Sequence, residues 1–76
     1  MEKLVEYIAK CLVEDPDQVE VETVRDNDDE QVIELRVAPD DRGRVIGKNG
    51  RTAHAIRTLL STASPEYRNI SLEIVD

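Results

Sequence analysis

The sequence predicts an α+β domain with the element order αββααβ, in which a three-stranded sheet is covered on one face by three helices. Three runs of residues alternate between apolar and polar side chains with a period of two, as half-buried strands do. Three other segments repeat apolar residues at helical spacing, and a Gly-x-x-Gly sequence separates the last two of them. A chain of 76 residues has room for one hydrophobic core, so we expect residues 1–76 to form a single two-layer domain.

The first element is predicted to be an amphipathic helix over residues 2–13. Its apolar stripe consists of Leu4, Val5, Ile8, Cys11 and Leu12. This spacing predicts that Cys11 is a core residue rather than a reactive thiol. The helix is expected to stop at Asp15 and Pro16, because a residue that precedes proline is disfavoured in helical conformation.

Two strands are predicted next, at residues 19–24 and 32–37, and we expect them to pair as an antiparallel hairpin. Both runs alternate, and the second places three apolar side chains on one face, those of Ile33, Leu35 and Val37. The charged residues 26–30 between the strands are too polar to bury and predict a turn.

A short helix follows the hairpin. Pro39 ends the second strand, and Asp40 or Asp41 is a suitable N-cap for a helix that runs to about Ile46. Residues 47–50 then interrupt the helical pattern.

The last two elements are a longer helix, from Arg51 to about Thr62, and a strand at residues 70–75. The apolar arc of the helix is broad and consists of Ala53, Ala55, Ile56, Leu59, Leu60 and Ala63. A turn is expected at residues 64–66. If the second and third strands are neighbours, the helical connection between them makes them parallel, with a right-handed crossover.

Charge is distributed unevenly along the chain. The net charge is −7, which by itself argues against a nucleic-acid partner. However, the segment 42–57 has no acidic residue and five basic ones, while the other sixty residues carry five basic and all seventeen acidic side chains, a net of −12. Because exposed charges are screened beyond about 8–10 Å, the basic segment is able to hold a phosphate chain locally. Its basic residues are Arg42, Arg44, Lys48, Arg51 and Arg57.

The sequence Gly47-Lys48-Asn49-Gly50 lies within this basic segment, between the two predicted helices. Glycine permits positive φ and, without a Cβ, a close approach of another backbone. Gly50 precedes the N-terminus of the longer helix, where unpaired N–H groups and the helix dipole favour an anion, and Lys48 adds a positive charge. These four residues therefore predict a platform for one or two backbone phosphates, with Val45 and Ile46 as an apolar wall for bases.

Other functions are less consistent with the residues. Gly43 to Lys48 has the spacing Gly-x-x-x-Gly-Lys, one residue short of a nucleotide-binding P-loop, and Asn49 replaces the Ser or Thr that would bind magnesium. With only two aromatic residues, both tyrosines, the chain lacks the stacking surfaces of other RNA-binding folds.

We also expect no catalytic centre, no metal site and no cofactor. Cys11 and His54 are the only residues of their types, so neither has visible partners for metal binding or acid–base catalysis. No apolar run is long enough to span a bilayer, and the first residues do not resemble a signal peptide. We therefore expect a soluble, cytoplasmic protein without a membrane partner.

The segment from Asp41 to Ala53 closely resembles the Gly-x-x-Gly region of KH domains, and the element order resembles the type II, prokaryotic form. In length the chain is similar to the small bacterial single-KH proteins of the KhpA family, also called YlqC. The resemblance implies a bacterial RNA chaperone or regulator that is linked to cell growth, division and shape. It also implies pairing with a second copy or with the larger KH-containing protein KhpB (Jag).

The resemblance further implies a groove that clamps about four nucleotides of single-stranded RNA. Its residues are Gly47, Lys48, Asn49 and Gly50 at the sugar-phosphate backbone, Val45 and Ile46 along the groove, and Arg44 and Arg51 at its flanks. In many KH domains both middle loop positions are basic. Asn49 departs from that pattern, so weaker binding is expected. The residues leave open whether His54 or Arg57 contacts RNA.

A second function is consistent with the same sequence. The longer helix has a broad apolar arc. The pattern does not decide whether one small core covers all of it, and any part that stays exposed favours pairing between chains. The chain is then a homo- or heterodimerisation module, in which RNA binding is secondary or shared with a KhpB-like partner.

Overall fold

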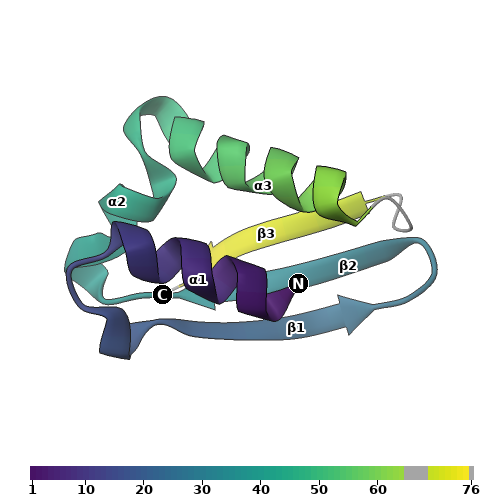
Figure 1. The fold of residues 1–76 in the computed structure, drawn as a ribbon, viewed down its shortest axis with the longest axis horizontal. Coiled ribbons are helices and arrows are strands. Elements are labelled where there is room, and N and C mark those ends of the chain that lie inside the picture. Colours follow the sequence, from purple (N-terminus) through teal and green to yellow (C-terminus); the bar gives the residue numbers. More distant parts are fainter. Residues whose placement is uncertain (65–68, 76) are drawn as a thin grey trace.

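The three alternating runs of the sequence form one mixed sheet. In a computed structural model, which describes residues 1–64 and 69–75, β1 (Glu20–Asp26) pairs antiparallel with β2 (Glu30–Arg36). β3 (Asn69–Val75) runs parallel to β2, so the strand order is β1-β2-β3 (Figure 1). The predicted hairpin and the predicted parallel arrangement of the second and third strands are both confirmed.

The charged cluster between β1 and β2 is a tight turn held by the backbone and the side chain of Asn27, whose N–H donates to the Glu30 carbonyl oxygen at 3.0 Å. The Asn27 Oδ1 atom accepts the backbone N–H groups of Asp29 and Glu30 at 2.9 and 3.0 Å. Asp26 and Glu30, which were predicted to belong to the turn, are the end residues of the two strands instead. Their side chains are at least partly exposed, so the strands extend into the charged cluster without burying a carboxylate.

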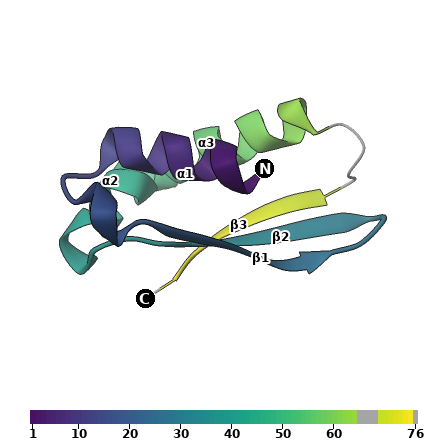
Figure 2. The same cartoon turned by 60° about the horizontal axis from the view of Figure 1, so that its bottom comes forward.

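Three helices cover one face of the sheet. They are α1 (Glu2–Leu12), α2 (Arg42–Ile46) and α3 (Arg51–Ala63), and Figure 2 shows them as a layer on one side of the three strands. Short 3-10 turns at Pro16–Gln18 and Pro39–Asp41 connect α1 to β1 and β2 to α2. The predicted fold class is therefore confirmed.

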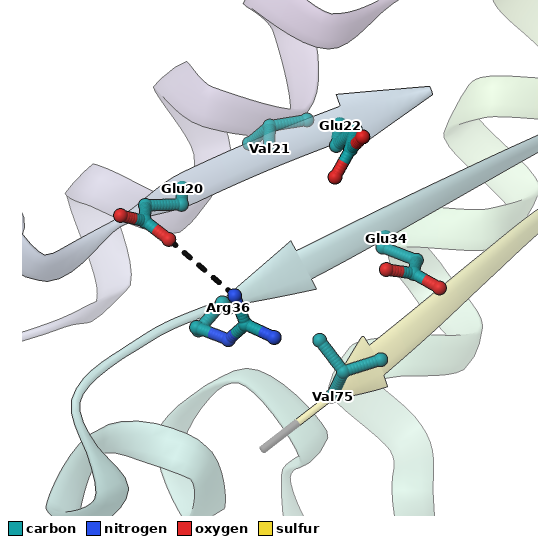
Figure 3. Close-up of a pocket in the computed structure, with 6 residues that line it drawn as sticks. All are labelled: Glu20, Val21, Glu22, Glu34, Arg36 and Val75. Carbon is teal, nitrogen blue, oxygen red and sulfur yellow. Dashed lines mark ion pairs between the residues drawn. The ribbon is translucent and has the colours of Figure 1, made fainter. Parts of the chain in front are cut away.

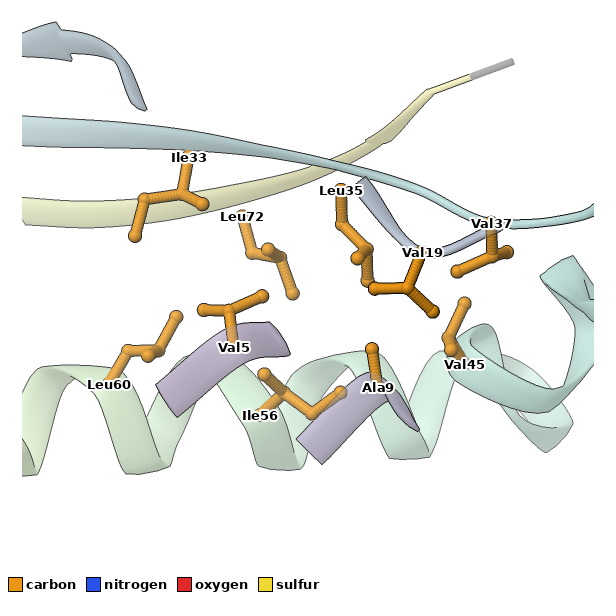
Figure 4. Packing of buried hydrophobic residues seen from close by; sticks show 10 residues of the cluster. All are labelled: Val5, Ala9, Val19, Ile33, Leu35, Val37, Val45, Ile56, Leu60 and Leu72. Carbon is orange, nitrogen blue, oxygen red and sulfur yellow. The ribbon is translucent and has the colours of Figure 1, made fainter. Parts of the chain in front are cut away.

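The core lies between the two layers (Figure 4). The fully buried Ile33, Leu35 and Leu72 point from the sheet toward Val5 of α1 and Leu60 of α3. Burying each large aliphatic side chain contributes about 1.5–3 kcal/mol, so this cluster holds the helices on the sheet. Its remaining members are Ala9, Val19, Val37, Val45 and Ile56.

Cys11 does not belong to this core, and the prediction of a core cysteine is wrong. The thiol is exposed, whereas Val5 and Ala9 are each only 1% exposed. The buried face of α1 is centred on these two residues. At 100° per residue, Cys11 points roughly 140° away from that centre.

Asp41 occupies the N-cap position of α2, but its carboxylate makes no capping hydrogen bond within the described residues. Its backbone is already helical, with φ −97° and ψ −6°, whereas a capping residue needs an extended conformation. The carboxylate is instead buried against the end of α1, where it accepts the backbone N–H groups of Glu14 and Asp15, both at 3.1 Å.

Part of the turn predicted at residues 64–66 lies outside the described residues, since Ser64 is described and the next four residues are not. None of the helices in the described ranges combines the length and the apolar character needed to cross a membrane.

Candidate functional site

Gly47 ends α2 in a conformation that only glycine adopts readily. Its φ and ψ are 77° and 172°, a region that side-chain-bearing residues occupy only under strain. A Cβ on Gly47 would also lie 2.2 Å from Thr52 Oγ1, 2.7 Å from Thr52 Cβ and 2.8 Å from Thr52 N. Because two of these atoms are fixed by the backbone of α3, the close contact between loop and helix requires glycine at this position.

Asn49 and Gly50 complete the turn between the helices in left-handed conformation. Asn49 has φ 58° and ψ 26°, and Gly50 has φ 75° and ψ 13°. Asparagine is one of the few residues with a side chain that tolerates this region, so the backbone explains why Asn49 suits this position. A Cβ on Gly50 would meet no atom within 4 Å. The space beside Gly50 is therefore open to a second backbone.

The loop Gly47–Gly50, called the GxxG loop below, presents positive charge at the start of α3. Lys48 and Arg51 are both exposed, and the first turn of α3 contains no acidic residue. In the described part of the chain, no side chain caps the N-terminus of this 13-residue helix. The Arg51 N–H donates to the carbonyl oxygen of Lys48, so the helix offers an anion chiefly the positive end of its dipole, next to the charges of Lys48 and Arg51.

The two apolar residues before the loop differ in their availability. Val45 is 0% exposed and packs in the core, whereas Ile46 is 39% exposed next to the loop. Val45 therefore supports the loop from within the core. Of the pair predicted as an apolar wall, only Ile46 presents substantial surface to a ligand.

Arg44 lies beside the loop and is paired with two carboxylates. Its Nη2 atom donates to Glu14 Oε1, and its Nε atom lies 3.3 Å from Asp41 Oδ1. Sequence reasoning missed this arrangement, because Glu14 is 30 positions upstream and Asp41 was interpreted only as a helix cap. The two carboxylates bring the end of α1 into the candidate site.

His54 and Arg57 differ in what they offer to a ligand. His54 is exposed on α3. The guanidinium of Arg57 donates to the carbonyl oxygen of Leu72, from Nε at 3.2 Å and from Nη2 at 2.9 Å. Arg57 therefore ties α3 to β3.

Residues 2–74 match the family model described as KhpA/KhpB, KH domain. The chain belongs to this family. It is similar to the RNA-binding protein KhpA of Caldanaerobacter subterraneus, at 49% identity over 99% of this chain and 100% of the relative. The proteins of the same name in Halalkalibacterium halodurans and Clostridium acetobutylicum are 47% and 46% identical, over 100% and 99% of this chain and 100% of each relative. No solved structure matches the chain significantly.

In this KhpA/KhpB KH domain, the outer face of the sheet has the opposite charge character to the GxxG loop. A shallow hollow of about 260 Å³ is lined by Glu20, Val21, Glu22, Glu34, Arg36 and Val75 (Figure 3). One of its three carboxylates, that of Glu20, is paired with Arg36 at 3.6 Å. The excess of carboxylates makes this hollow a poor site for an anionic ligand.

The described part of this KH domain offers no metal-binding site. Residues 1–64 and 69–75 contain no group of three or more His, Cys, Asp or Glu side chains that could hold a metal ion. The relatives are named as RNA-binding proteins, not as enzymes.

Proposed function

We propose that this protein binds single-stranded RNA and that the GxxG loop clamps a stretch of about four nucleotides. The observation that carries the proposal is the geometry of the loop. Gly47 places the loop against Thr52, so Lys48 and Arg51 lie at the uncapped N-terminus of α3 in a segment that contains no acidic residue. Membership of the KhpA/KhpB family and the names of the relatives support it.

The proposed contacts divide by chemistry. Lys48, Asn49 and the backbone at Gly47 and Gly50 meet phosphates and sugars, while Arg44 and Arg51 add charge at the flanks. Ile46 offers an aliphatic surface to bases. With three to five phosphate contacts, log K is expected to fall against log salt with a slope of about −2 to −3.5, since each contact on a single strand contributes about −0.7.

The direct test is titration of a short labelled RNA against the wild type and the double variant Lys48→Asp/Asn49→Asp. Aspartate tolerates the left-handed conformation at position 49, so the fold is expected to survive. A matched control is Lys3→Asp/Gln18→Glu, which changes the net charge equally at exposed positions of α1 and the following turn. We expect the loop variant to bind RNA at least tenfold more weakly than the wild type and the control variant to bind nearly as well as the wild type. Circular dichroism checks that both variants fold. Equal affinity of all three proteins would overturn the proposal.

By resemblance to the family, the proposal extends to a cytoplasmic RNA chaperone or regulator that acts in cell growth, division and shape. An inventory of RNA crosslinked to the protein in cells tests this role. We expect the Lys48→Asp/Asn49→Asp variant to lose those crosslinks. An unchanged inventory would remove the loop from the role.

A second candidate function is dimerisation through α3. The core takes only one side of this helix, while Ala55, Leu59 and Ala63 are exposed at four-residue spacing, with Leu59 at 55%. Such a ridge of one large and two small apolar residues suits a second copy or a KhpB-like partner. Sedimentation at tens of micromolar is expected to show a dimer that Leu59→Asp dissociates. A monomeric wild type would remove the homodimer, and co-purification with KhpB would test the heterodimer.

A further inference from the structure

The positive charge of Arg44 is already engaged in the protein without RNA. Its terminal Nη2 atom donates to Glu14 Oε1, and its Nε atom lies 3.3 Å from Asp41 Oδ1. A phosphate that approaches Arg44 next to the GxxG loop therefore meets a guanidinium in which one of the two terminal nitrogens, Nη2, is occupied by a carboxylate.

The two carboxylates on Arg44 hold it differently. The Asp41 side chain is only 4% exposed and also accepts the N–H groups of Glu14 and Asp15. It is therefore fixed in place. The Glu14 side chain is 74% exposed. Within residues 1–64 and 69–75, the hydrogen bond that this side chain makes is the one that it accepts from Arg44. A surface ion pair of this kind is weak, so Glu14 can move away at little cost.

We infer that Glu14 is an intramolecular competitor that occupies the place of an RNA phosphate on Arg44, and that Asp41 is the positioning residue for Arg44. This inference rests on the proposed RNA-binding function. Carboxylate and phosphate oxygens both accept hydrogen bonds from a guanidinium in the same planar geometry. When RNA displaces Glu14, the contact from Asp41 to Nε keeps the guanidinium in place and leaves Nη2 free for a phosphate oxygen.

The inference predicts opposite effects from two substitutions that change the net charge equally. Glu14→Gln removes the competitor and should tighten RNA binding by about two- to fivefold, the range that a surface ion pair allows. Asp41→Asn removes the support of Arg44 and should weaken binding by a similar factor. If the carboxylates acted only through the overall negative charge of the protein, both substitutions would tighten binding.

Salt dependence gives a second readout. In the wild type, a phosphate contact at Arg44 breaks the exposed ion pair with Glu14, whereas in Glu14→Gln no such pair has to be broken. The tightening by Glu14→Gln should therefore be largest at low salt and should shrink as salt screens the pair.

The experiment is fluorescence anisotropy with an unstructured, labelled octanucleotide RNA across a range of salt concentrations. Glu6→Gln is the matched control. Glu6 is an exposed residue of α1, and like Glu14 it pairs with a cation, Lys10, at 3.6 Å. We expect Glu14→Gln to tighten binding clearly more than Glu6→Gln does. We also expect this gain to vanish in the Arg44→Gln background, since the competitor then has nothing to occupy.

Equal effects of Glu14→Gln and Glu6→Gln would overturn the inference, as would a gain that persists without Arg44. In either case RNA binding by the wild type would leave the proposed function standing. A wild type that binds no RNA would overturn both. Thermal unfolding checks Asp41→Asn, and if that variant does not fold, the comparison of Glu14→Gln with and without Arg44 decides.

Discussion

The GxxG loop and the outer face of the sheet carry charges of opposite sign. The segment 42–57 around the loop carries five basic and no acidic residues. On the sheet, Glu22 lies opposite Glu34, and Glu34 lies opposite Glu73, so three carboxylates form one row across all three strands. Like charges directly opposite each other destabilise a sheet.

This difference shows how an acidic protein can still present a site for a polyanion. The row of glutamates makes the sheet face repulsive to RNA, while the basic charges gather at the start of α3. Since exposed charges are screened within about 8–10 Å, the two surfaces act nearly independently. The negative body then restricts where RNA binds more than it limits how tightly the loop holds it.

The largest expected effect comes from removing the geometry of the loop. Gly47→Ala forces a Cβ to within 2.2–2.8 Å of Thr52 at a φ of 77°. We expect a loss of about 2–4 kcal/mol in unfolding free energy, from strain and overpacking together, and loss of RNA binding. Gly50→Ala meets no atom within 4 Å and should lose only about 1 kcal/mol through its left-handed φ.

Gly43 provides the control for these two substitutions. It lies in α2, and a Cβ there also meets no atom within 4 Å. Gly43→Ala should therefore be neutral or stabilise the protein by up to about 1 kcal/mol. Denaturant unfolding measures all three variants. If Gly47→Ala were as stable as Gly43→Ala, the contact with Thr52 would not matter.

The next prediction tests which basic residues belong to the RNA site. Arg57 lies in the basic segment, but its two hydrogen bonds go to the Leu72 carbonyl of β3. Arg57→Gln should cost about 1–2 kcal/mol of unfolding free energy, because a hydrogen bond from a charged group is lost. RNA affinity should fall less than twofold. A tenfold loss of affinity with unchanged stability would instead place Arg57 in the RNA site.

A smaller effect is expected on the sheet. Glu34→Lys changes the middle of the glutamate row into two opposite-charge pairs, with Glu22 and with Glu73. Stability should rise by about 0.5–1 kcal/mol at low salt, and the gain should shrink as salt screens the charges. Thermal unfolding at two salt concentrations measures it. A gain that is independent of salt would point to packing rather than charge.

The sequence was sufficient for the fold because the three strands and the two longer helices repeat their patterns over 7 to 13 residues. The alternation in all three strands and the apolar arc of α3 identify their elements, and a helical connection implies parallel strands. Cys11 was misplaced because it lies at one edge of the apolar arc of α1, while Val5 and Ala9 are buried on the other side of that arc. Periodicity identifies the arc, but it does not show which part of the arc faces the sheet.

The candidate site was predictable only in part, since its chemistry depends on contacts between distant residues. The positive φ of Gly47 follows from its place between two helices, but its contact with Thr52 does not. Glu14 and Asp41 were not recognised as partners of Arg44, because nothing in their spacing links residues on separate elements. Val45 was expected on the surface, since a pattern that precedes a loop does not reveal which apolar residue faces the core.

The smallest effect concerns Glu2, which lies on α1 above the edge strand β1. Its pKa is lowered because its carboxylate accepts hydrogen bonds from the side chain and the backbone N–H of Thr23. A lowered pKa in the folded state means that the contribution to stability is present above the ordinary pKa of 4.5 and is lost as the pH falls through the folded value. Glu2→Gln should therefore melt slightly below the wild type at pH 7, and the two melting temperatures should converge toward pH 3. A difference that stays constant over this range would show that the carboxylate charge of Glu2 does not stabilise its contact with the sheet.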